Sequence, residues 1–161
     1  MYRTLLVCRH AKAAAGDDDF DRPLEPRGER DAAAAGRWLS GQGFGIDRAL
    51  CSPALRARRT WELAGAELVD AEAGAVETVH DDRIYEATAG ELIAVLNELP
   101  GSVGTAALIG HNPGLEDVVS VLTGRPCRLK TAAVAVLTGP GDWTAAEPGW
   151  AQLREITEPR G

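Results

Sequence analysis

Cysteine is scarce in this chain, and the few cysteines present are not paired in the sequence. There are three, Cys8, Cys51 and Cys127, with no CxxC spacing. An odd number of isolated cysteines supports neither a disulfide framework nor a zinc knuckle. We therefore expect them to be small buried hydrophobic side chains in a reducing compartment.

Metal-binding patterns are missing as well. The three histidines stand at positions 10, 80 and 111, so neither an HxH nor an HxxxH spacing occurs. Because metal-binding histidines on one strand or helix recur at such short spacings, no metal site is predicted. We expect His80, which lies between a valine and an aspartate, to be a surface residue. Nothing in the sequence calls for a cofactor.

Long apolar runs are also absent. No stretch approaches the roughly 20 apolar residues that a membrane span needs. The N-terminus, with Arg3 before a short apolar run and alanines at 13–15, faintly resembles a signal peptide. Its apolar core is too short, however, and residues 9–12 interrupt it with charge. We expect a cytoplasmic protein that does not associate with a membrane.

Positive charge is in the minority. Lys and Arg number 17 against 24 Asp and Glu, so the net charge is −7. Binding to a nucleic-acid backbone depends on clustered basic residues, and this composition argues against it. Any recognition of phosphate must therefore be local. With 161 residues and no linker or repeat, the chain is expected to form one domain over 1–161. The sequence does not indicate an oligomeric state.

Strand and helix patterns alternate along the whole chain. Such alternation is typical of βαβ units, in which helices cover both faces of a mostly parallel sheet. The fold class predicted is α/β, a three-layer α-β-α sandwich with about six strands. Strands are expected at 5–8, 49–51, 76–79, 105–109, 132–137 and 151–156. Helices are expected at 26–40, from a Ser52-Pro53 opening to 68, from a Thr88/Glu91 capping box to 99, and at 115–122.

Charged side chains follow directly after the first predicted strand. Arg9, His10 and Lys12 stand where the apolar run 5–8 ends. Ligands of open α/β sheets bind beyond the carboxyl ends of the strands. Arg9 and His10 are therefore the first candidates for a functional site.

Two further strands end at residues of the same kind. The strand at 105–109 leads into His111, and the strand at 49–51 leads into the helix that carries Arg56. A cation near the start of a helix opposes the helix dipole unless an anion lies beside it. In a parallel sheet these strand ends share one edge, so two imidazoles and two guanidiniums can converge there.

This combination suits phosphate chemistry. The arginine side chain binds phosphoryl oxygens through its planar fork and stays charged at any working pH. A neutral imidazole can attack phosphorus and carry it covalently.

The residues resemble the histidine phosphatase superfamily, also called the phosphoglycerate-mutase-like superfamily, and more closely its SixA-like branch of phosphohistidine phosphatases. The hallmark of the superfamily is an Arg-His-Gly triplet after the first strand, which is Arg9-His10-Ala11 here. Any single triplet is a weak signal, but an ordered set of motifs is strong. The matching segments are 9–12, 19–24 with 27–28, 52–57 with Thr60, 84–87, 110–116 and 130–133.

The resemblance implies phosphoryl transfer in two steps, without metal or cofactor. His10 would attack the phosphorus, and water would then hydrolyse the phosphohistidine. Arg9, Arg56 and His111 would hold the phosphoryl oxygens. The backbone around Asn112 could add amide donors.

The source of the proton for the leaving group stays open. Glu86 is the candidate general acid, because it follows a loop at about the chain position where larger superfamily members place theirs; the alternative is a solvated loop carboxylate. Lys12 and Arg22 either line the rim of the phosphate site or pair with the acidic cluster at 17–21.

The leading functional hypothesis is a small phosphatase that acts on phosphohistidine or another phosphomonoester. Its partner would be a phosphorylated small molecule or a phosphohistidine protein. A mutase is less favoured, because the chain lacks long insertions that would keep water from a phosphorylated intermediate. A catalytically weak module that binds phosphate or a phosphopeptide on the same fold is the alternative.

Overall fold

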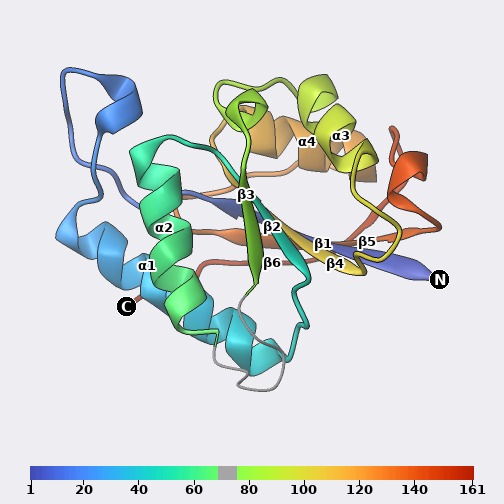
Figure 1. Cartoon of the computed structure of the whole chain (residues 1–161), viewed down its shortest axis with the longest axis horizontal. Coiled ribbons are helices and arrows are strands. Elements are labelled where there is room, and N and C mark those ends of the chain that lie inside the picture. Colours follow the sequence, from blue (N-terminus) through green and yellow to red (C-terminus); the bar gives the residue numbers. More distant parts are fainter. Residues whose placement is uncertain (69–75) are drawn as a thin grey trace.

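The computed structural model describes residues 1–68 and 76–161. These residues form a sheet with helices packed on it, and the elements follow one another in the predicted order (Figure 1). The strands are β1 (Tyr2–Arg9), β2 (Arg48–Cys51), β3 (Glu77–His80), β4 (Thr105–Gly110), β5 (Val134–Pro140) and β6 (Gln152–Thr157). The helices are α1 (Pro26–Gln42), α2 (Leu55–Ala66), α3 (Ala89–Asn97) and α4 (Gly114–Thr123). Short 3-10 helices cover Asp19–Asp21, Asp82–Ile84 and Trp143–Ala145.

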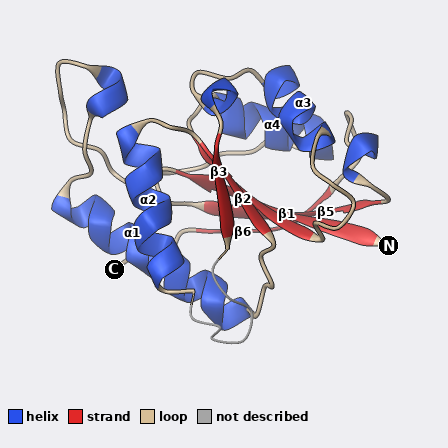
Figure 2. Cartoon of the chain, in the orientation of Figure 1, coloured by secondary structure: helices blue, strands red, loops and turns tan. Residues whose placement is uncertain are grey.

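The sheet has the strand order β3-β2-β4-β1-β5-β6. Figure 2 shows the strands in red, between the helices that cover the sheet. The pairs β2–β3, β2–β4 and β1–β4 are parallel, whereas β5 runs antiparallel to both β1 and β6. The expectation of a mostly parallel sheet of about six strands is thus confirmed. The antiparallel part is the edge formed by the last two strands.

Helices cover both faces of this sheet, with α1 and α2 on one side and α3 and α4 on the other (Figure 1). The burial of β1 on both faces explains why its sequence is apolar without alternation. Leu6 and Cys8 pack toward α1 and α2, while Leu5 and Val7 pack toward α3 and α4. A strand that is buried on both faces needs apolar residues at every position. The α-β-α layering is therefore confirmed.

Local signals define several of the helix ends. The side chain of Thr88 accepts a hydrogen bond from the backbone amide of Glu91, and the side chain of Glu91 accepts one from the backbone amide of Thr88. Together the two bonds form the predicted capping box of α3. Gly124 ends α4 in the left-handed region, with φ 71°. Within residues 1–68 and 76–161, no helix is both long and apolar enough to cross a membrane.

The prediction for the start of α2 is wrong. The helix begins at Leu55 with Ala54 at its N-cap and no side-chain cap, so Pro53 is not its first helical residue. The hydroxyl of Ser52 accepts from the Ala54 amide in the turn before the helix, but it also contacts His111. The hydroxyl of Ser52 therefore serves the turn before α2 and not the first turn of the helix itself.

The cysteines are placed as expected. Cys8, Cys51 and Cys127 are free and buried. Burial raises the pKa of the Cys8 and Cys51 thiols to about 12, so both stay protonated at neutral pH. Their role is packing.

Candidate active site

The parallel register brings three strand ends to one edge of the sheet. Arg9 at the end of β1 lies beside Gly110 at the end of β4, and Cys51 at the end of β2 lies beside Ile109. The backbone ladder continues past the strands, because the amide of His10 donates to the Gly110 carbonyl at 3.0 Å. Residues that follow these strands are therefore held next to one another.

His10 is a neutral imidazole whose Nε2 has no hydrogen-bond partner among the residues that the structure describes. Its Nδ1 lies 2.8 Å from the carbonyl oxygen of Ala11. Since a carbonyl only accepts, Nδ1 carries the proton and the lone pair stands on Nε2. Burial lowers the pKa of His10 to about 4, and the nearby Arg56 and Arg9 charges act in the same direction. An unprotonated Nε2 at neutral pH is what a nucleophile requires.

The loop after β1 is anchored to α2. The amide of Ala11 donates to the hydroxyl of Thr60 at 2.9 Å, and that hydroxyl donates to the Arg56 carbonyl at 2.7 Å. Thr60 is buried. One side chain thus connects the loop that carries His10 to the helix that carries Arg56.

Helix α1 holds the same loop from the other side. The amide of Glu25 donates to the carbonyl of Lys12 at 2.9 Å. A Cβ atom at Gly28 would stand 2.1 Å from that carbonyl oxygen, so only glycine permits this approach. The side chain of Lys12 is exposed. The structure therefore uses the Lys12 backbone for support and leaves its ammonium in solvent.

Arg9 is fixed by the loop that leads into β5. Its Nη1 donates to the carbonyl of Leu129 at 3.0 Å, while its Nε is buried without a partner among the described residues. The amide of Ala132, whose φ is 60°, donates to the His10 carbonyl at 3.0 Å. A non-glycine residue in the left-handed region is held there by its surroundings.

Arg56 has the anion that its position near a helix start requires. Its Nη1 donates to the backbone carbonyl of Asp19 at 2.6 Å, and its Nη2 lies 3.1 Å from the carboxylate Oδ2. The Arg56 side chain is only 7% exposed, whereas that of Asp19 is 50% exposed. A buried guanidinium is thus covered by a carboxylate from a surface loop.

Asp19 has further partners beside Arg56. The hydroxyl of Tyr85 donates to Oδ2 at 2.7 Å, and Nη1 of Arg22 lies 3.2 Å from Oδ1. The Tyr85 hydrogen bond, together with Arg22 and Arg56, lowers the pKa of Asp19 to about 2. The carboxylate is therefore ionised at neutral pH.

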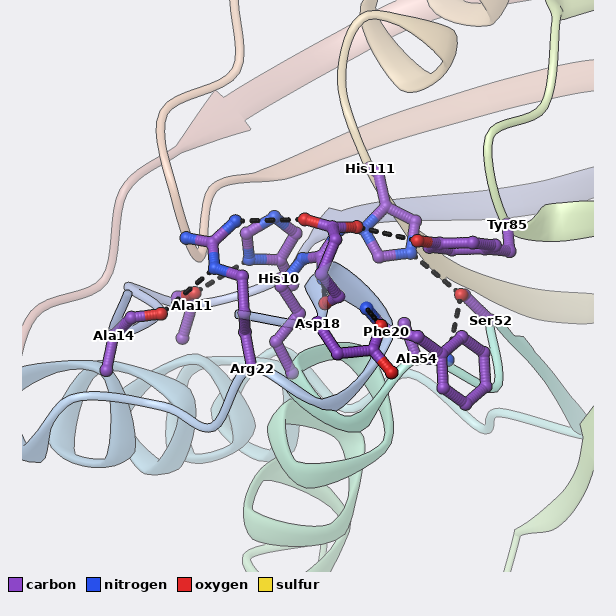
Figure 3. A network of polar contacts seen from close by, with 12 residues as sticks. His10, Ala11, Ala14, Asp18, Phe20, Arg22, Ser52, Ala54, Tyr85 and His111 are labelled. Atoms are coloured by element: carbon purple, nitrogen blue, oxygen red, sulfur yellow. Dashed lines mark hydrogen bonds and ion pairs between the residues drawn. The ribbon is translucent and has the colours of Figure 1, made fainter. Parts of the chain in front are cut away.

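His111 lies next to His10, with ring centroids 5.2 Å apart. Its Nε2 is 2.7 Å from the hydroxyl of Ser52, while its Nδ1 is buried with no partner in residues 1–68 and 76–161. Figure 3 shows the ring between His10 and Tyr85. Burial and the neighbouring His10 lower the pKa of His111 to about 3. Both imidazoles are therefore neutral at pH 7.

The remaining predicted site residues are Arg22, Asn112 and Glu86, and their surroundings differ from one another. Arg22 belongs to the cluster, because it pairs with Asp19 and its charge lowers the pKa of His10. The side-chain amide of Asn112 donates to the Leu129 carbonyl at 2.9 Å, so it helps to hold the same loop as Arg9. Glu86 is exposed, with φ 57°, and directly follows Tyr85. Its role as general acid stays a prediction.

Asp19, Tyr85 and the pairing of Ser52 with His111 were not predicted from the sequence as parts of the site. Asp19 and Tyr85 lie within two of the segments that resemble the superfamily, and this resemblance is the sequence feature that could have indicated them. Nothing local indicates that a carboxylate from an acidic surface loop covers a buried arginine.

The arrangement is suited to a small anion. Arg9 Nε, Arg56 Nε and His111 Nδ1 are buried nitrogens without partners in the described part of the chain. Buried polar groups without partners are rare, and a cluster of them points to a ligand that supplies the missing contacts. Among the described residues, no group of three or more His, Cys, Asp or Glu side chains is arranged to hold a metal ion.

The two buried imidazoles should make stability depend on pH. The pKa values are lowered from 6.5 to about 4 at His10 and to about 3 at His111. Below pH 6.5 the unfolded chain takes up protons that the folded chain does not, so the free energy of unfolding should fall as the pH drops from 6.5 toward 4. Urea denaturation in phosphate-free buffer measures this slope. His10→Gln should make this slope shallower, whereas His80→Gln, at an exposed position, should leave it unchanged. Equal slopes in both variants would contradict the conclusion that His10 is buried as a neutral imidazole.

Comparison with known sequences places the chain in a family. A sequence profile of the histidine phosphatase superfamily (branch 1) matches residues 5–98. An uncharacterised protein of Mycobacterium tuberculosis is 37% identical in an alignment of 165 positions that covers 94% of this chain and 99% of the relative. An uncharacterised chloroplast protein of Arabidopsis thaliana is 30% identical in an alignment of 162 positions that covers 88% of this chain and 74% of the relative.

Solved structures lead to the same family. A candidate phosphohistidine phosphatase SixA of Nakamurella multipartitia has a TM-score of 0.87 and 29% identity, covering 99% of this chain and 97% of its own. The protein histidine phosphatase SixA complexed with tungstate has a TM-score of 0.83 and 27% identity, covering 97% of both chains. These likenesses support a phosphatase function. The chain belongs to the histidine phosphatase superfamily and, within it, to the SixA-like branch.

Proposed function

We propose that this protein is a metal-independent phosphatase that hydrolyses phosphohistidine or small phosphomonoesters through a covalent intermediate on His10. One observation carries the proposal. The Nδ1 of His10 is bound to the Ala11 carbonyl, so the lone pair of Nε2 is free next to the buried Arg9, Arg56 and His111. A neutral nucleophile surrounded by donors for oxygen atoms matches the needs of phosphoryl transfer.

In the first step, Nε2 of His10 forms a bond to phosphorus while the bond to the leaving group breaks. The leaving group departs with the bonding electron pair and takes up a proton from Glu86 or from solvent. The phosphorylated imidazole keeps its Nδ1 proton, whose hydrogen bond to Ala11 stabilises the positive ring. Arg9, Arg56 and His111 offset the charge on the phosphoryl oxygens.

In the second step, water attacks the phosphorus and the P–N bond breaks. The electron pair returns to Nε2, so His10 is again neutral. The proton lost by water ends on the released phosphate, or on Glu86 if that residue gave up its proton in the first step. No metal ion is needed at any point, since the arginines carry the positive charge that a metal would otherwise supply.

The similar proteins support phosphohistidine as a substrate. One similar structure is that of the protein histidine phosphatase SixA complexed with tungstate, a tetrahedral oxyanion like phosphate. A protonated imidazole leaves more easily than an alkoxide. A P–N substrate therefore needs less help from a general acid than an ester does.

The purified protein should hydrolyse both p-nitrophenyl phosphate and phosphoramidate, at rates that a chelator does not change. Brief exposure to labelled phosphoramidate followed by a denaturing quench should trap a phosphoenzyme that is labile in acid and stable in base. Loss of activity with the chelator, restored by Mg²⁺ or Zn²⁺, would contradict the metal-free reaction.

Glu86→Gln tests the acid within the same assay. If Glu86 donates the proton, ester hydrolysis should fall by roughly 10²-fold, the range of general acid catalysis. Phosphoramidate hydrolysis should fall far less. Glu147→Gln, another exposed glutamate, serves as the matched control. An equal loss, or no loss, on both substrates would leave Glu86 without a role as the acid.

A further inference from the structure

Ser52 contacts His111, although it takes no part in the two steps of the proposed reaction. The residue is fully buried. Its hydroxyl oxygen accepts from the amide of Ala54 at 3.3 Å and lies 2.7 Å from Nε2 of His111. The hydroxyl has one proton to donate. The position of that proton decides which tautomer His111 adopts.

The two tautomers leave different numbers of groups without partners. If Nε2 of His111 carried the proton, the Ser52 hydroxyl would accept twice and its own proton would have no acceptor among the described residues. The Nδ1 lone pair, which is buried, would also lack a donor. If Nδ1 carries the proton, the hydroxyl of Ser52 donates to Nε2, and only the Nδ1–H remains free. Buried polar groups favour the arrangement that satisfies more of them.

The free nitrogen of His111 is on the side of the ring that faces the site. Figure 3 shows Nε2 turned to Ser52 and the other ring nitrogen turned to the side of His10. The two rings are neighbours, with centroids 5.2 Å apart. An N–H at Nδ1 is therefore directed at the region where the phosphoryl group would be attacked.

We propose that Ser52 is a positioning residue that holds His111 as the Nδ1–H tautomer, so that a neutral N–H donor faces the phosphoryl oxygens. The tautomer follows from the contacts alone, and only the identity of the anion rests on the proposed function. Ser52 contacts neither the phosphoryl group nor His10 in this scheme. It acts through His111.

The two histidines thus have the same tautomer and opposite functions. In His10, Nδ1–H is bound to the Ala11 carbonyl, so the ring presents the Nε2 lone pair. In His111, Nε2 is bound to Ser52, so the ring presents the Nδ1 proton. One ring attacks and the other donates. A neutral donor also adds no further positive charge beside Arg9 and Arg56.

The imidazole ¹⁵N spectrum of the free protein at pH 7 tests the tautomer without any catalysis. The sequence has only three histidines, so His80→Gln and His10→Gln suffice to assign the signals. We expect Nδ1 of His111 to appear as a protonated nitrogen and Nε2 as an unprotonated one. A protonated Nε2 overturns the proposal, whatever the activity of the protein. Conversely, an inactive protein with the expected spectrum would contradict the proposed function and leave the tautomer assignment intact.

Ser52→Ala tests the positioning. Without the hydroxyl donor, the proton of His111 should redistribute toward Nε2 in the same spectrum. The inhibition constant of inorganic phosphate should rise about tenfold, the scale of one hydrogen bond. Ser40→Ala, at an exposed position in α1, is the matched control. An unchanged tautomer in Ser52→Ala would overturn the role of Ser52, and if this variant fails to fold, the wild-type spectrum still decides the tautomer.

Discussion

Replacing His10 with alanine should lower turnover by about a thousandfold or more, the scale seen when a nucleophile is removed. The reason is that the Nε2 lone pair is the group that forms the bond to phosphorus. No phosphoenzyme should be trapped from labelled phosphoramidate. Hydrolysis of p-nitrophenyl phosphate and of phosphoramidate, followed over hours at high protein concentration, measures the loss.

Binding of phosphate should survive this change, because Arg9, Arg56 and His111 remain. Calorimetric titration with inorganic phosphate should therefore give an affinity in His10→Ala within several-fold of the wild type. His80→Ala makes the same substitution at an exposed histidine and should keep full activity. Unchanged hydrolysis in His10→Ala, or label on Cys8 or an aspartate, would refute the nucleophile. A wild-type protein that binds phosphate but never turns over would instead favour a binding module.

Arg56→Gln should have the second largest effect, a fall in kcat/KM of roughly 10²- to 10³-fold. This is the cost observed when a donor to a developing negative charge is removed. Glutamine keeps much of the side-chain length and some hydrogen-bonding capacity but has no charge. Steady-state kinetics on both substrates measures the fall. A change of less than about tenfold would mean that Arg56 serves structure and not the reaction.

Asp19 is expected to compete with the phosphoryl group for Arg56. Its carboxylate lies 3.1 Å from Nη2 of Arg56, so a phosphoryl group must compete with it for the same guanidinium. Asp19→Asn should therefore lower the inhibition constant of inorganic phosphate roughly tenfold, since one charge-assisted hydrogen bond changes a binding constant by about that factor. Asp17→Asn removes the same charge from the same exposed loop, away from the contacts of Arg56, and is the control.

The double variant shows whether Asp19 acts through Arg56. In the Arg56→Gln background the carboxylate has no guanidinium to occupy, so Asp19→Asn should change phosphate inhibition less than it does in the wild type. Equal effects in both backgrounds would show that the two residues act independently. Weaker phosphate binding in Asp19→Asn alone, with unchanged thermal stability, would mean that Asp19 supports the site and does not compete with the ligand.

Much of this protein could be predicted from local patterns. An apolar run without alternation indicated that β1 is buried on both faces, and Leu5 to Cys8 do pack on both. The capping box of Thr88 and Glu91 forms within four residues of chain, so the sequence defines it. Arg9 and His10 directly follow a strand, and the parallel register alone requires that such residues meet those after β4.

Contacts between distant residues could not be predicted in this way. The hydroxyl of Ser52 has a local amide within reach, and local rules made it a helix cap; its second partner, His111, lies 59 positions away. Asp19 reaches Arg56 over 37 positions and Tyr85 over 66. A side chain with one proton or one charge pairs according to which groups the fold brings near. Local patterns therefore suffice to predict the sheet, its layers and the residues at its edge. Contacts across the fold select which nitrogen of each histidine is free and which anion covers Arg56.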